Sequence, residues 1–173
     1  MCKLPDAVLN SEVVDLYERI KQYCNPALQY ACRSWHKHLI DKDVTTSVVT
    51  SILHQFLEKK FLFWLEVLSV LGAAREAVDV LGVAARWLKV CWVSHLIFCH
   101  IYWDWIQELP TLDLVNDCFC FVTRFFEVIS TSSPHIYHSA LPLSPKPQLC
   151  RNYINHMPTP LQELYVDFQL HGS

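Results

Sequence analysis

The clearest pattern along the chain is a series of apolar residues that recur every three or four positions between Val49 and Leu71. This spacing keeps side chains on one face of a helix, and it predicts a single continuous helix across the whole stretch. A second apolar series flanks the first, so the helix becomes apolar almost all round toward its end. A helix of that kind lies at the centre of its domain. Gly72 is expected to end it.

Similar stripes predict helices on both sides of this central one. Ala74 to Leu88 forms the next stripe, and no helix breaker follows until Pro110, which is expected to stop it. Leu112 to Ile129 forms another, which the serine-rich stretch Ser130–Pro134 should end. Nearer the start, Leu4–Tyr23 holds a short amphipathic helix capped by Asn10 or Ser11, and Asn25-Pro26 begins a helix whose apolar face runs from Leu28 to Leu39.

The last forty residues have a different composition. Six of the nine prolines lie at or beyond Pro134. This density predicts an extended tail with at most a short helix near Leu161–Phe168. The pattern as a whole predicts an all-α fold, an irregular helical bundle or array over residues 1–133, followed by an extended, Pro-rich tail over residues 134–173.

Composition removes several classes of function. The chain has 173 residues, only three glycines and a net charge of −3. Scarce glycine excludes Gly-rich phosphate loops and dinucleotide fingerprints, and the acidic balance argues against nucleic acid as a partner. The first residues lack the apolar run of a secretory signal, so a cytoplasmic location with reduced thiols is expected for the eight cysteines.

Histidine and cysteine in the middle of the chain raise the question of a metal site. Cys91, His95 and Cys99 follow at helical spacing, with His100 beside them. One ion cannot bind both cysteines, because about 12 Å of helix separates them. The other candidates lack a paired C-x-x-C knuckle, and they are Cys24, Cys32, His36, His38, Cys118 and Cys120. Packing is therefore favoured for all of them, and neither a metal nor another cofactor is predicted.

Two further groups resemble functional sites less closely. Ser132 or Ser133 with His135, and Asp113 or Asp117 upstream, supply the residue types of a hydrolytic triad. No G-x-S-x-G elbow accompanies them, and serines before a proline first of all stop a helix, so no catalytic residue is predicted. The Glu58-Lys59-Lys60 run is interpreted as a solvated patch. Three tryptophans have the spacing of core residues: Trp35, Trp64 and Trp87.

The longest apolar run of the chain is Val90–Trp103, interrupted by Ser94, His95 and His100. Its fourteen residues reach only about 21 Å as a helix, short of a hydrocarbon core of roughly 30 Å. A membrane span is therefore disfavoured. A helix that lies on a membrane surface or faces a partner remains open.

Four segments in order resemble the helical connector of large fungal NACHT NTPases with C-terminal WD repeats. They are Cys2–Lys21, Leu28–Leu39, Glu58–Gly72 and Phe121–Lys146. Residues 1–24 are similar to the end of the C-terminal subdomain of the NTPase, and residues 134 to about 147 to the segment that leads into the propeller. The chain departs from the family at Val90–Trp105, interpreted as an insertion, and after Gln148.

The resemblance implies a helical connector that lacks both the NTPase and the WD-repeat propeller. The chain has no G-x-x-x-x-G-K-[ST] loop and no WD dipeptide, so no catalytic or nucleotide-binding residue of the family can be assigned to it. The resulting prediction is a non-enzymatic structural or interaction module, whose partner is a related full-length protein or another helical surface. The alternatives are a hydrolase or metal-dependent enzyme that uses the His/Cys-rich middle, and a membrane-surface helical protein that uses residues 90–105.

Overall fold

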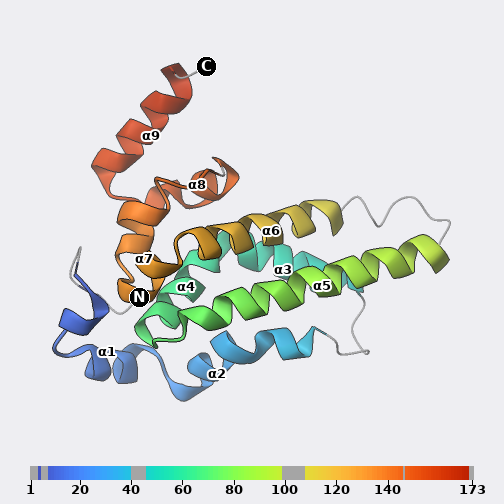
Figure 1. Ribbon diagram of the computed structural model, residues 1–173, viewed down its shortest axis with the longest axis horizontal. Helices are drawn as coiled ribbons and strands as arrows, with labels where there is room; N and C mark the ends of the chain where they lie inside the picture. The colour runs from blue at the N-terminus through green and yellow to red at the C-terminus, as the bar shows by residue number, and fades with distance from the viewer. Residues whose placement is uncertain (1–3, 5–7, 40–45, 99–107, 146, 172–173) are drawn as a thin grey trace.

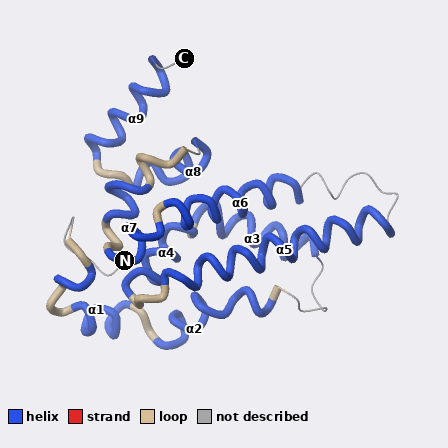
Figure 2. The backbone as a smooth tube through the Cα atoms, viewed as in Figure 1, coloured by secondary structure: helices blue, strands red, loops and turns tan. Residues whose placement is uncertain are grey.

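A computed structural model describes residue 4 and residues 8–39, 46–98, 108–145 and 147–171. Throughout these ranges the regular elements are helical, which confirms the all-α prediction (Figures 1 and 2). The helices are α1 (Leu16–Tyr23), α2 (Pro26–Ser34), α3 (Thr46–Lys59), α4 (Phe61–Val70), α5 (Ala74–Phe98), α6 (Glu108–Arg124), α7 (Phe126–Thr131), α8 (Pro147–Tyr153) and α9 (Thr159–His171). Short 3-10 turns cover Asn10–Glu12, Trp35–His38 (η2) and Ile154–His156, and a π-helical turn covers Ile136–Ala140.

The central helix is broken, although its apolar stripe is continuous. α3 ends at Lys59 and α4 begins at Phe61, so the prediction of one helix from Val49 to Leu71 is wrong at Lys60. The physical reason lies far away in the sequence. The Tyr153 hydroxyl accepts a hydrogen bond from the Phe61 N–H (2.7 Å) and donates one to the Leu57 carbonyl (2.9 Å), so it pairs with backbone groups on both sides of the break.

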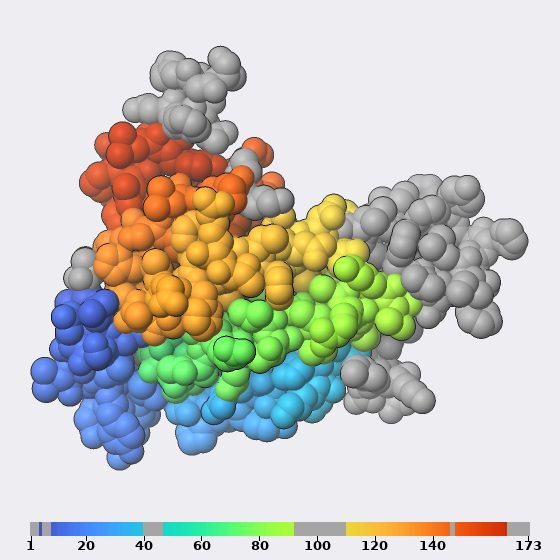
Figure 3. All heavy atoms as spheres, in the orientation of Figure 1, coloured from blue at the N-terminus to red at the C-terminus, as the bar shows by residue number. Residues whose placement is uncertain are grey.

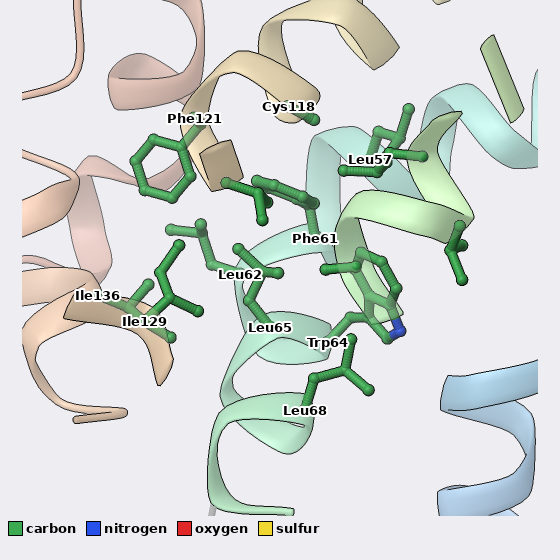
Figure 4. Packing of buried hydrophobic residues seen from close by; sticks show 14 of the residues in the cluster. Leu57, Phe61, Leu62, Trp64, Leu65, Leu68, Cys118, Phe121, Ile129 and Ile136 are labelled. Atoms are coloured by element: carbon green, nitrogen blue, oxygen red, sulfur yellow. The ribbon is translucent and has the colours of Figure 1, made fainter. Parts of the chain in front are cut away.

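α4 forms the centre of the core, as its composition predicts. Every residue of this helix except Phe63 is buried. In Figure 4, Leu62 and Leu65 lie on the side of Ile129 from α7, and Phe61 contacts the Phe121 ring of α6. Gly72 ends the helix in the left-handed conformation (φ 65°), and the Ala73 N–H then reaches back to the Leu68 carbonyl at 2.8 Å. This confirms the predicted cap.

α5 and α6 lie side by side as the longest helices (Figure 1). α5 runs through Leu88 as far as Phe98, and residues 99–107 lie outside the described part of the chain. Pro110 does not stop α5, because it lies in the first turn of α6, where its missing N–H costs no helical hydrogen bond. The predicted helix Leu112–Ile129 is likewise two helices, α6 and α7, separated at Phe125.

The tail is helical, so the prediction of an extended segment over residues 134–173 is wrong for its described part. Pro147 is the first residue of α8 and Pro160 the second of α9, positions at which proline favours a helix. Leu149, Cys150, Tyr153 and Met157 are buried with the rest of the core. The segment after residue 134 therefore packs on the helical domain, although α9 extends away from the body in Figure 1.

The N-terminal segment differs from its prediction in detail. α1 starts after Asp15, so neither Asn10 nor Ser11 caps it. The cap predicted at Asn25 is confirmed, because the Asn25 Oδ1 atom accepts a hydrogen bond from the Leu28 N–H at 2.8 Å. In the space-filling view, residues near the N-terminus (blue) lie against the region around residue 130 (orange) (Figure 3).

Candidate functional site

The predicted metal candidates separate into buried and exposed groups. Cys24, Cys32 and Cys118 are buried, Cys120 is exposed, and Cys91 is half-buried on α5. Burial raises the pKa of the Cys32 and Cys118 thiols, which favours the neutral form. The side chains of His95, Cys99 and His100 lie outside the described residues. Within the described part of the chain, no three His, Cys, Asp or Glu side chains come together in a way that could bind a metal ion.

The serines near His135 are packed inside the fold. Ser132 and Ser133 are buried, and the Ser132 Oγ atom donates a hydrogen bond to the Val8 carbonyl at 2.7 Å. The His135 Nδ1 atom lies 2.8 Å from Ser139 Oγ, one turn further along. The Ser132 hydroxyl and the His135 ring thus each have a partner other than the one a hydrolytic triad requires, and Asp113 is exposed on α6.

Asn10 connects three parts of the molecule, which the sequence did not indicate. Its Nδ2 atom donates to the Ser69 carbonyl (3.2 Å) and to Ser69 Oγ (3.0 Å), at the end of α4. Its Oδ1 atom accepts a hydrogen bond from the Ser133 N–H at 3.0 Å. Together with the Ser132–Val8 bond, these contacts form what we call the Asn10 clasp (Val8, Asn10, Ser69, Ser132, Ser133). The clasp joins the N-terminal segment to the chain just after α7.

A second polar group lies between α3 and α6. The His54 Nδ1 atom is 3.1 Å from Thr111 Oγ1, and its Nε2 atom is 3.4 Å from a Glu58 oxygen. Hydroxyl, imidazole and carboxylate in a row are the components of a nucleophilic triad. However, Thr111 is only 1% exposed, so its hydroxyl is closed to a substrate, and the row fastens two helices together.

One carboxylate is buried in the core. Glu66 on α4 is 7% exposed, and one of its oxygens accepts a hydrogen bond from the Tyr137 hydroxyl at 3.3 Å. Burial, and to a smaller extent the charge of Glu66, raises the pKa of Tyr137 well above its usual range. The phenol therefore stays protonated at neutral pH, and its hydroxyl donates to the Glu66 carboxylate.

An apolar groove in the described part of the chain lies between two walls. One wall is α2 with η2, and the other is α3 with α4. The cavity volume is about 840 Å³. Three aromatic rings, Trp35, Phe56 and Trp64, line it in mutual contact, with ring centres 5.4 to 6.0 Å apart. The predicted core role of tryptophan thus holds for Trp64, which is 3% exposed, whereas Trp35 is only half-buried beside the groove.

Comparison with models of known protein families, with curated proteins and with solved structures finds no match for this chain. Among the residues described, no helix combines the length and the apolar character needed to cross a membrane.

Proposed function

We propose that this chain is a non-enzymatic helical connector of the kind found between the NTPase and the propeller of fungal NACHT–WD-repeat proteins, acting in the cytoplasm. The observation that carries the proposal is the Asn10 clasp. In the family that the sequence resembles, residues 1–24 correspond to the end of the NTPase and residues from 134 onward to the approach to the propeller. The clasp joins the first of these segments to Ser132 and Ser133, which directly precede the second, across 123 positions of sequence.

The contacts give the clasp a mechanical role. Its hydrogen bonds to Ser69 and Ser133 are part-buried, and each is worth about 1 kcal/mol. Because Ser69 belongs to the most buried helix, a displacement of the N-terminal segment acts on the core and on the segment after α7 together. A module with this arrangement transmits a change in position between its two neighbours without chemistry of its own.

Hydrogen exchange on the isolated chain tests whether the Asn10 clasp holds the N-terminal segment to the chain after α7. Asn10→Ala removes the acceptor of the Ser133 N–H, and exchange at this amide should become about tenfold faster, equivalent to about 1.4 kcal/mol. Amides in α3 should be unchanged. The matched control is Asn155→Ala, at an exposed position in the turn Ile154–His156. Equal protection of Ser133 in both variants would show that the clasp does not hold the two segments together.

The function is tested in a chimera. Residues 8–145 replace the connector of an intact fungal NACHT–WD-repeat protein, and nucleotide hydrolysis is compared with and without occupancy of the propeller. We expect the chimera to keep this dependence, and Asn10→Ala to weaken it while Asn155→Ala leaves it intact. A chimera that folds but has lost the dependence would refute the proposal, as would saturable ATP or GTP hydrolysis by the chain alone.

A further inference from the structure

The apolar groove is separate from the Asn10 clasp, and its walls are firmly held. The Trp64 Nε1 atom donates a hydrogen bond to the Cys32 carbonyl at 2.7 Å, which fixes α2 against α4. The edge-to-face contacts among Trp35, Phe56 and Trp64 give the groove a rigid aromatic floor. Ile52 continues the apolar surface to the rim and is 62% exposed.

The charged residue of the groove is a base. Of its lining residues, only Lys60 carries a full charge at neutral pH, and His38 adds a second basic group. Lys60 has no carboxylate partner within the described ranges, and its Nζ atom lies 5.7 Å from the ring centre of Phe63. An unpaired ammonium beside an apolar cavity complements a ligand that is apolar along its length and anionic at one end.

The size of the groove favours a small molecule over a protein helix. At roughly 30 Å³ per heavy atom, an eighteen-carbon acid occupies on the order of 600 Å³. A ten-residue helix is about 15 Å long and 10 Å wide, and occupies on the order of 1,200 Å³. The groove, at about 840 Å³, exceeds the volume of the first and falls short of the volume of the second, and it lies in the usual range of small-molecule sites.

We propose that the groove between α2 and the α3–α4 pair binds a long-chain carboxylic acid, with the alkyl chain on the aromatic floor and the carboxylate at Lys60. The alkyl chain covers Phe56 and Trp35, which are otherwise half-exposed. The carboxylate of the ligand forms a charge-assisted contact with the Lys60 ammonium, at the break between α3 and α4. The site is independent of the connector function and needs no residue of the Asn10 clasp.

The test is calorimetric titration of the full chain with oleate below its micellar concentration, with methyl oleate as the uncharged probe. We expect one oleate per chain. Lys60→Gln should weaken oleate binding about tenfold and leave methyl oleate unchanged. Ala31→Trp places a large ring in the groove from an exposed position and should weaken both ligands at least tenfold. Ala27→Trp, also exposed on α2 and outside the lining, is the matched control.

Thermal melting of each variant separates loss of binding from loss of fold, because all three positions are exposed. Oleate binding that is equal in Ala31→Trp and Ala27→Trp would place the ligand elsewhere and overturn the proposal. The proposal would also be overturned by binding heat that appears only above the micellar concentration of oleate. It would likewise be overturned if Lys60→Gln weakened the binding of oleate and methyl oleate equally. Binding of an amphipathic helical peptide that Ala31→Trp abolishes, with no oleate binding, would assign the groove to a protein partner instead.

Discussion

The two faces of the α3–α4 pair carry similar side chains and have opposite environments. On one face Leu57 and Phe61 are fully enclosed by α6 and α8, and the Phe61 ring meets the Phe121 ring edge-on at 6.0 Å. On the other face Ile52 and Phe56 remain partly exposed above the groove. Hydrophobic content alone therefore does not decide which face becomes core. The covering elements do, because α6 and α8 pack against α3, and α5 and α7 pack against α4.

The largest expected effect is a direct contrast between the faces. Leu57→Ala should destabilise the protein by about 3 kcal/mol, because it leaves a cavity among fully buried neighbours. Ile52→Ala on the same helix should change the free energy of unfolding by less than about 0.5 kcal/mol. Urea denaturation of both variants measures the difference. Similar losses at the two positions would mean that the groove face is also closed in solution.

The next prediction concerns the Tyr153 hydroxyl on the buried face. Tyr153→Phe leaves the Phe61 N–H and the Leu57 carbonyl without their partner, and should cost about 2 kcal/mol in the free energy of unfolding. Tyr30→Phe, on the exposed surface of α2, is the control and should have no measurable effect. A loss below 0.5 kcal/mol in Tyr153→Phe would show that the hydroxyl does not stabilise the break.

The third effect appears at alkaline pH. Burial raises the pKa of both Tyr137 and Tyr153 above the ordinary value of 10.0. Above pH 10 the unfolded chain therefore loses these protons while the folded protein retains them, so stability falls by about 1.4 kcal/mol per pH unit for each tyrosine. Below pH 10 the two groups contribute no pH dependence. Denaturation between pH 9 and 11 checks this, and Tyr137→Phe should flatten the slope. An unchanged slope in that variant would contradict the burial of Tyr137.

Local patterns predicted much of the fold. The stripes of α4 and α5, the cap at Asn25 and the ending of α4 at Gly72 depend on residues close in sequence, and the structure confirms them. The break at Lys60 was not predictable in this way, since the apolar spacing passes through it unchanged. Its cause, Tyr153, lies 92 residues beyond Phe61.

The prolines misled for a different reason. Their presence predicts helix termination at Pro110 and extended chain beyond residue 134, whereas Pro110, Pro147 and Pro160 each lie in the first turn of a helix. Composition counts prolines without their positions, and position decides whether a proline breaks or begins a helix. The Asn10 clasp and the groove were also beyond sequence reasoning. Both are built between segments that only the tertiary fold brings together.

The Asn10 clasp also has a consequence for the time course of folding during synthesis. Asn10 is synthesised before its partner Ser133, which lies 123 residues further along the chain. At about 5 to 20 residues per second, the ribosome needs roughly 6 to 25 s to complete that interval. Throughout this time α1 can form locally, whereas the segment before it cannot yet form its hydrogen bond to Ser133. The stretch around Asn10 is therefore synthesised well before it can reach all of its native contacts.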